Sequence, residues 1–412
     1  PIIEYTKEVV YVNDYEIAIV KKDELILKNL GNEKQTPFIQ KLDLELAAIE
    51  KGGYEHFMLK EIFEQPDTIF DCLRGRLLPE EKKIIMAGVD NHIEALTKAS
   101  RILIVACGTS WHAGLYAEYL IEELCRIPVE VEYASEFRYR NPIVNKGDVI
   151  IAISQSGETA DTLVALQKAK EDGAFIFGVV NAVGSSIARI SNAGAYTHAG
   201  PEIGVASTKA FLTQIVATYL IGLYIAQIRG IKFIDEVRDL IEDLEAMPER
   251  IERYLETSER IKELAHEFKS AQSILFLGRH VGYPVALEGA LKLKELAYMH
   301  AEGFAAGEVK HGPIALIEEG TPVLVIMPHP KSVLHDKMVS NVQEIEARGA
   351  RAIIIAAESD SDITSPRAIR IPDAPILFQP LLAVIPLQLF AYESAVIRGY
   401  DVDQPRNLAK SV

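Results

Sequence analysis

From about residue 100 onward, short apolar runs alternate with amphipathic stretches. Residues 101–106, 148–153 and 174–180 are apolar at nearly every position, and a helical pattern over residues 160–171 separates the last two runs. Strands that are buried on both faces of a parallel sheet have this composition. The order strand, helix, strand therefore predicts an α/β fold with a parallel sheet flanked by helices.

The second half of the chain repeats this pattern. Residues 273–278 match the run at 101–106, and residues 306–311 correspond to 134–139 at a separation of 172 residues. Residues 320–326 then correspond to 147–153. Three matches nearly in register predict a duplicated domain. Between the halves, apolar residues recur at helical spacing over residues 233–268, which predicts an amphipathic connector rather than a loose linker.

The chain starts with a different pattern, a strand-like stretch over residues 9–20 with a turn signal at Asn13 and Asp14. An isolated hairpin is only marginally stable and needs a larger sheet. We therefore expect residues 1 to about 30 to be the end of a domain whose beginning lies outside this sequence.

Composition narrows the possible functions. A length of 412 residues predicts two or three domains, and a net charge of −16 disfavours binding to nucleic acid or to an anionic membrane. Three scattered cysteines fit a reducing cytoplasm better than a disulfide framework. The longest apolar stretches, at 211–228 and 375–391, are interrupted by polar residues. We interpret them as buried segments of a soluble protein.

Hydroxyl side chains follow two of the predicted strands. Ser154, Gln155, Ser156 and Thr159 lie between a strand and a helix, and Thr109 with Ser110 occupies the preceding strand-to-helix turn. Ligands bind at the carboxyl ends of parallel strands, and helix N-termini bind anions. Either turn alone could simply cap its helix; together they favour a phosphate site. Residues 327–330 of the second repeat lack the hydroxyls, so we expect one phosphosugar per chain.

A charged triplet lies on the predicted helix at residues 286–296. Glu288, Lys292 and Glu295 fall on one helix face, and His311 follows in a loop beside Gly312. A solvated charged stripe has the same spacing. Acid/base chemistry is favoured by the position of this helix at the carboxyl end of a strand and by the histidine.

Several motifs together resemble the glucosamine-6-phosphate synthase family. They lie at residues 56–66, 107–110, 154–159, 202–209, 288–295, 310–313 and 405–412. The resemblance covers essentially the whole chain. It implies two tandem SIS-type domains, at residues 46–235 for phosphate binding and 236–400 for acid/base residues. It also implies a glutaminase remnant and linker at 1–45 and an active-site tail at 401–412.

The same resemblance implies a role for each site residue. His311, supplied by the neighbouring subunit of a homodimer and assisted by Glu288, opens the ring of fructose 6-phosphate. Lys410 forms a Schiff base at C2, which ammonia displaces to give glucosamine 6-phosphate. Glu295 moves a proton between C1 and C2, and Lys292 handles the proton on O1. Further substrate contacts are implied for Val205, Ala206, Ser207 and Ala409.

The sequence also leads to two expected absences and leaves two alternative functions. No cofactor and no metal are expected, because the histidines lack ligand spacing and the glycine-containing turns lack a nucleotide signature. The glutaminase of the family is missing from this sequence, so it cannot hydrolyse glutamine. A plain sugar-phosphate isomerase and a non-catalytic sugar-phosphate sensor are the alternatives. Lys410 argues against the first, and the lack of a DNA-binding element argues against the second.

Overall fold

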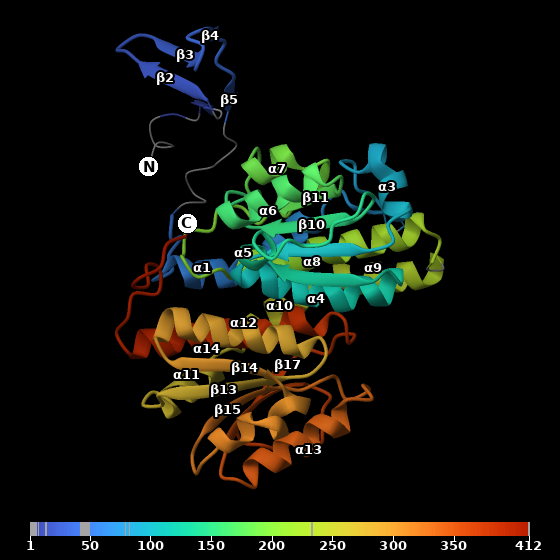
Figure 1. Cartoon of the computed structure of the whole chain (residues 1–412). Helices are drawn as coiled ribbons and strands as arrows, with labels where there is room; N and C mark the ends of the chain where they lie inside the picture. Colours follow the sequence, from blue (N-terminus) through green and yellow to red (C-terminus); the bar gives the residue numbers. More distant parts are fainter. Residues whose placement is uncertain are drawn as a thin grey trace. The chain divides into compact units, whose positions relative to one another are not determined.

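The computed structural model describes residues 6, 8–12, 15–41, 50–78, 80–81, 83–231 and 234–410. The chain divides into two compact units, Pro1–Gly53 and Tyr54–Val412 (Figure 1). The predicted turn residues Asn13 and Asp14 and the last two residues of the tail, Ser411 and Val412, lie outside the described residues, as does the predicted domain boundary at residue 45.

The first unit is made of short antiparallel strands. Strand β1 (Glu8–Val10) pairs with β5 (Ile39–Lys41), and β2 (Glu16–Val20), β3 (Leu25–Asn29) and β4 (Lys34–Gln35) form a meander. The predicted hairpin over residues 9–20 is therefore wrong, since the two halves of that stretch pair with other strands. A tight turn, with Lys21 N–H bonded to the Glu24 carbonyl at 2.9 Å, pairs β2 with β3 instead.

The second unit contains two sheets of five parallel strands. The first sheet has the order β12-β11-β10-β8-β9, and its two strands β8 and β10 are buried at every position, as predicted. The strands are β8 (Ile102–Ala106), β9 (Val129–Tyr133), β10 (Val149–Ser154), β11 (Phe175–Val180) and β12 (Ala193–Tyr196). The accompanying helices are α3 (Ile93–Thr97), α4 (Gly108–Cys125), α5 (Ala134–Phe137), α6 (Ala160–Glu171), α7 (Ser186–Ile190) and α8 (Lys209–Ile228).

The second sheet has the order β14-β13-β15-β16-β17, so each sheet places its second strand outside its first and the third to fifth on the other side. This shared order supports the predicted duplication. The strands are β13 (Ser273–Gly278), β14 (His300–Ala305), β15 (Pro322–Ile326), β16 (Arg351–Ala357) and β17 (Ala368–Ile371). The helices are α12 (Gly282–Ala297), α13 (His335–Glu346) and α14 (Gln379–Ile397), with 3₁₀ turns at Ala306–His311 and Pro313–Leu316.

The predicted amphipathic connector consists of three helices in the described part of the chain. These are α9 (Ile234–Glu245), α10 (Met247–Leu255) and α11 (Arg260–Glu267), and Pro248 begins the second of them. Their apolar faces are buried, with Leu244, Met247 and Ile251 fully enclosed. The unit opens with α1 (Phe57–Phe63), α2 (Gln65–Leu73) and the small hairpin of β6 (Leu77–Leu78) and β7 (Lys83–Ile84).

Two helices, α8 and α14, are long and apolar enough to cross a membrane by length and composition alone. In the apolar window of each helix, 89% and 83% of the residues are buried inside the protein. Several of their polar side chains are bonded internally, as in the Thr213 hydroxyl that donates to the Lys209 carbonyl at 3.1 Å, while the buried Tyr219 hydroxyl has no partner among the described residues. Both helices therefore form the core, as the sequence predicted.

Candidate active site

The turn after β10 is organised by its own hydroxyl groups. The buried Ser154 Oγ accepts a bond from Gly157 N–H at 3.0 Å and lies 3.3 Å from Thr159 Oγ1, while Ser156 Oγ accepts from Glu158 N–H at 3.2 Å. Gly157 has φ +66°, and a Cβ there would lie 2.0 Å from Ser185 Oγ. Thr159 is the N-cap of α6 but makes no side-chain capping bond. The capping alternative thus does not describe Thr159, and the helix N-terminus keeps its capacity for an anion.

The turn after β8 divides its hydroxyls between two neighbours. Ser110 Oγ accepts a bond from Gln214 Nε2 of α8 at 3.0 Å. Thr109 Oγ1 instead donates to Glu288 Oε1 at 3.0 Å and accepts from Lys292 Nζ at 3.2 Å. The structure therefore brings Thr109 to the acid/base residues of the second repeat.

Glu288 and Lys292 form a fully buried ion pair on α12. Both are 0% exposed, with Lys292 Nζ 3.3 Å from Glu288 Oε1 and 2.6 Å from Glu295 Oε2. The solvated-stripe alternative is therefore wrong for these two residues. Burial alone raises the pKa of a carboxyl, but Lys292, His112 and Thr109 outweigh it and lower the pKa of Glu288. For Lys292, burial is outweighed by Glu288 and Glu295, which raise its pKa.

His112 is a partner of this pair that the sequence analysis missed. Its Nδ1 lies 2.7 Å from Glu288 Oε2, and the ring is buried on α4. Thr109 and His112 are three residues apart, which places both on one face of that helix. This spacing was the available signal, but it has meaning only once α4 is known to face α12.

His311 lies apart from the charged cluster. It is the exposed last residue of a 3₁₀ turn, followed by Gly312 with φ +147°. Among the described residues, Glu288 contacts Thr109, His112 and Lys292 through its carboxylate. The structure of one chain does not bring His311 to Glu288, so the predicted assistance of His311 by Glu288 stays a prediction.

The C-terminal tail is docked on the first repeat. The Asp403 carboxylate accepts bonds from the N–H groups of Phe57 and Met58 at 3.0 and 2.9 Å, which caps α1. The Asp403 carbonyl accepts from Val205 N–H at 3.0 Å. The tail is therefore ordered by contacts with residues more than 340 positions away in sequence.

Lys410, in the C-terminal tail, contacts the loop that follows β12. Its Nζ donates to Glu202 Oε2 at 2.5 Å and to the Gly204 carbonyl at 2.7 Å, and its side chain is 25% exposed. The structure therefore pairs this amine with a buried carboxylate. Of the other predicted contacts, Ala206 is buried, Val205 and Ser207 are half-buried, and Ala409 is exposed beside Lys410.

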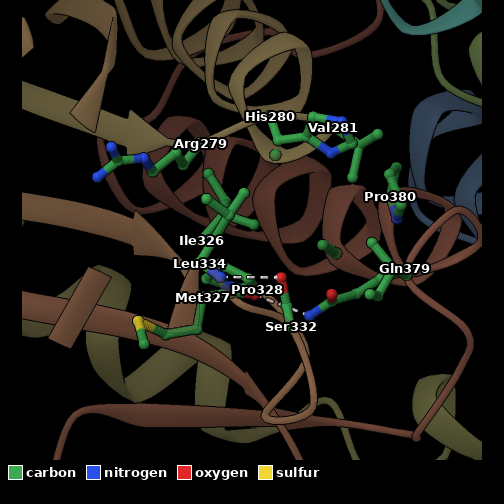
Figure 2. A pocket seen from close by; sticks show the side chains of 13 residues that line it. Arg279, His280, Val281, Ile326, Met327, Pro328, Ser332, Leu334, Gln379 and Pro380 are labelled. Carbon is green, nitrogen blue, oxygen red and sulfur yellow. Dashed lines mark hydrogen bonds between the residues drawn. The ribbon is translucent and has the colours of Figure 1, made fainter. Parts of the chain in front are cut away.

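At the strand ends of the second repeat, a pocket takes the place of the hydroxyl-rich turn (Figure 2). Met327 and Pro328 line it, and the Met327 carbonyl is occupied by Gln379 Nε2 at 2.7 Å. Ser332 is the one hydroxyl side chain among the described lining residues, and it accepts from Leu334 N–H at 3.2 Å. The pocket therefore lacks the set of hydroxyls found at the turn after β10.

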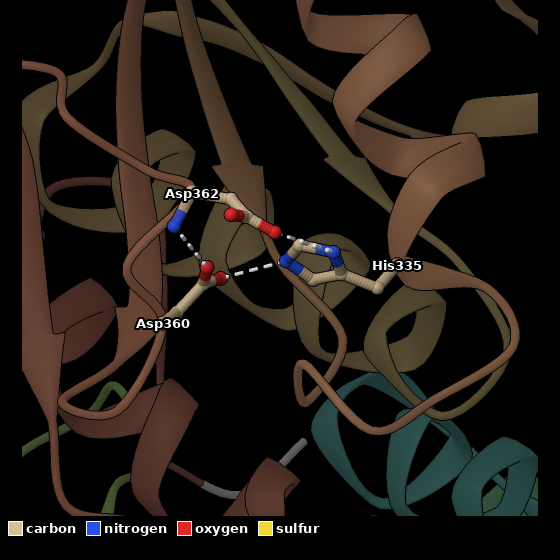
Figure 3. Close-up of side chains that lie close together, drawn as sticks. All are labelled: His335, Asp360 and Asp362. Carbon is tan, nitrogen blue, oxygen red and sulfur yellow. Dashed lines mark hydrogen bonds and ion pairs between the residues drawn. The ribbon is translucent and has the colours of Figure 1, made fainter.

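One group of side chains has the composition of a metal site. His335, Asp360 and Asp362 have ligand atoms within 4.8 Å of one another (Figure 3). However, His335 Nε2 is hydrogen-bonded to Asp360 Oδ2 at 2.8 Å, and Asp360 Oδ1 accepts from Asp362 N–H at 3.2 Å. We interpret the group as a buried histidine–carboxylate pair that ties the start of α13 to the loop after β16.

Comparison with known proteins gives consistent matches. The SIS domain model matches residues 95–224 and 267–398. Glutamine–fructose-6-phosphate aminotransferase (isomerizing) of Chlorobaculum tepidum is 52% identical over 414 residues, covering 100% of this chain and 67% of the relative. The protein of the same name from Bacteroides thetaiotaomicron is 51% identical over 417 residues, with the same two coverages.

Solved structures of similar proteins also match this chain. The C-terminal domain of glucosamine-fructose-6-phosphate aminotransferase from Francisella tularensis is 39% identical with a TM-score of 0.82, and the match covers 86% of this chain and 100% of that one. A putative phosphosugar isomerase from Silicibacter pomeroyi is 28% identical with a TM-score of 0.69, covering 84% and 99%.

Proposed function

The chain belongs to the isomerising glutamine–fructose-6-phosphate aminotransferase family as its C-terminal isomerase half, and we propose that it converts fructose 6-phosphate and ammonia into glucosamine 6-phosphate. A sugar phosphate is its substrate. The observation that carries the amination is the docked tail, which holds the Lys410 amine at Glu202 and Gly204. A plain isomerase would not need this amine.

The substrate phosphate is proposed to bind between the two turns of the first repeat. Ser110, Ser154, Ser156 and Thr159 supply hydroxyls, and the N-terminus of α6 supplies a favourable dipole. Backbone and side-chain groups near the sugar would come from Thr109, Gln155, Val205, Ala206, Ser207 and Ala409.

The acid/base steps are proposed for the second repeat. Glu295, which is 22% exposed and bonded to Lys292, would move a proton between C1 and C2, and Lys292 would handle the proton on O1. His311, exposed in one chain, would open the sugar ring in the site of a second copy. We therefore propose a homodimer with a shared active site.

The remaining third of the curated relatives lies outside this chain, which covers 67% of the Chlorobaculum tepidum protein. We propose that ammonia comes from glutamine through that part, and that residues 1–45 are its remnant and linker. The proposed domains are 46–235, 236–400 and 401–412. A soluble, cytoplasmic protein fits the buried helices and the free cysteines.

The proposed activity can be tested on the purified chain. Incubated with fructose 6-phosphate, it should form glucose 6-phosphate, because the acid/base residues are present. A coupled dehydrogenase assay measures the product, with Glu295→Gln as the inactive control. Glutamine should yield no ammonia in a parallel assay. Ammonia release, or a folded chain that leaves the sugar unchanged, would contradict the proposal.

Removing one hydroxyl from the turn after β10 should weaken substrate binding. A hydrogen bond to a charged group contributes ~1.5–3 kcal/mol, so Ser156→Ala should raise the Kd for fructose 6-phosphate by roughly ten- to a hundredfold. Isothermal titration measures the effect. Ser332→Ala, which removes the hydroxyl of the second-repeat pocket, is the matched control and should bind normally. Equal affinity of both variants would argue against this phosphate site.

A further inference from the structure

Lys410 is held by a carboxylate that is itself rigidly fixed. Glu202 has a fully buried side chain, and its Oε1 accepts bonds from the N–H groups of Thr208 at 2.8 Å and Ala210 at 3.1 Å. These bonds leave Oε2 facing Lys410 Nζ at 2.5 Å. The orientation of Glu202 therefore comes from the loop before α8 and does not depend on the tail.

The chemistry proposed for Lys410 makes this contact important. In the ion pair, Nζ carries a proton and has no lone pair for attack on a carbonyl carbon. A buried charge pair is costly to desolvate. When a bound sugar displaces water from the site, transfer of the proton to Glu202 replaces two charges by two neutral groups.

We propose that Glu202 positions Lys410 and exchanges a proton with it during Schiff-base formation, an inference that rests on the proposed covalent role of Lys410. Glu202 Oε2 takes one proton from Nζ. The freed lone pair forms the N–C2 bond, the carbonyl π pair moves to oxygen, and an Nζ proton passes to that oxygen. Glu202 then returns its proton to the hydroxyl, which leaves as water, and the protonated imine remains.

The Gly204 carbonyl completes the arrangement. It accepts a second bond from Nζ at 2.7 Å, so the amine stays oriented after Glu202 has taken one proton. The same peptide segment is fixed from its other side, because Glu61 Oε1 accepts from the N–H groups of Ile203 at 2.5 Å and Gly204 at 3.1 Å. The loop between Glu202 and Gly204 is thus held by α1 and by α8.

Glu61 adds a second buried carboxyl near the pair. Its Oε2 has no partner among the described residues, and burial, followed by the charge of Glu202, raises its pKa to about 8. This shift favours the uncharged form of Glu61, which does not add to the attraction that retains the proton on Lys410. Further charged groups on the packed elements are engaged elsewhere. Lys60 and Lys209 pair with Glu64 at 3.4 and 2.7 Å, and Asp403 caps α1.

The test is reductive trapping of the adduct with borohydride at pH 6–10, using fructose 6-phosphate and the full chain. Wild-type protein should form the Lys410 adduct over the whole range. Glu202→Gln should be roughly a hundredfold slower at pH 7, as for the loss of a general base. Most of the rate should return near pH 10, where hydroxide can take the proton in place of Glu202.

Glu202→Asp keeps a proton acceptor and should restore part of the rate at pH 7. Glu393→Gln, which removes a half-buried carboxylate from α14, is the control and should follow the wild type. Titration with fructose 6-phosphate verifies that each variant is folded and binds. If Glu202→Gln is uniformly slow at every pH, or matches the wild type, the proton exchange is wrong. If wild-type protein forms no adduct at Lys410, the proposed function fails instead.

Discussion

Lys410→Arg should abolish the reducible sugar adduct while sugar-phosphate binding is retained. A guanidinium keeps the positive charge beside Glu202, whose carboxylate lies 2.5 Å from Nζ, but it stays protonated and cannot form the imine. The measurement is borohydride trapping with fructose 6-phosphate, followed by peptide mass mapping. We expect a hexose-phosphate adduct on Lys410 in the wild type and none in the variant.

Lys310→Arg provides a matched control for this substitution. Lys310 pairs with Glu344 at 2.7 Å and is 55% exposed, so its replacement should leave the adduct unchanged. An adduct on Lys292 in the wild type would show that the covalent step was assigned to the wrong residue. In that case the plain isomerase would become the better interpretation of the chain.

Lys292→Met should cost about 3–5 kcal/mol of unfolding free energy, because it leaves Glu288 buried without its counter-charge. Urea unfolding at pH 7 measures the loss. The control is Lys98→Met, which removes an exposed pair with the same i, i+4 spacing, Glu94 to Lys98. Its cost should be far smaller, because a solvent-exposed ion pair contributes little to stability.

The sign of the pH dependence provides a second check on the buried pair. In the wild type the pKa of Glu288 is lowered, so its contribution to stability is present above the ordinary glutamate pKa of about 4.3 and is lost as the pH falls. In Lys292→Met, burial without the cation should raise that pKa. The loss of unfolding free energy caused by Lys292→Met should therefore be smaller at pH 4 than at pH 7. If the loss of unfolding free energy is the same at both pH values, it arises from lost packing and not from the unpaired charge.

Much of the fold was predictable because its strands lie in parallel sheets. Because β8 and β10 are buried on both faces, they are apolar at nearly every position. This pattern can be recognised from the sequence alone. The hydroxyl-rich turn after β10 was equally visible, because ligand sites of such sheets follow strand ends. The pairing of the short strands β1 and β2 was not, since their sequences do not specify a partner.

The missed site residues share one property, which is that their roles arise from contacts between distant parts of the chain. His112 meets Glu288 across 176 residues, and Glu202 meets Lys410 across 208. A lone histidine on a helix and a glutamate in a loop have no local pattern that marks them. Lys410 itself was predicted only from family resemblance, since a polar chain end normally suggests disorder.

The bonds from Thr109 and His112 to Glu288 also bear on how this protein could have evolved. Two copies of one fold became dependent on each other when the helix of one copy came to hold the buried charge of the other. If one repeat were moved alone into another protein, the Glu288 carboxylate would lose its partners on α4. That repeat would also supply only the phosphate site or only the acid/base residues. The two repeats therefore depend on each other and form one functional unit.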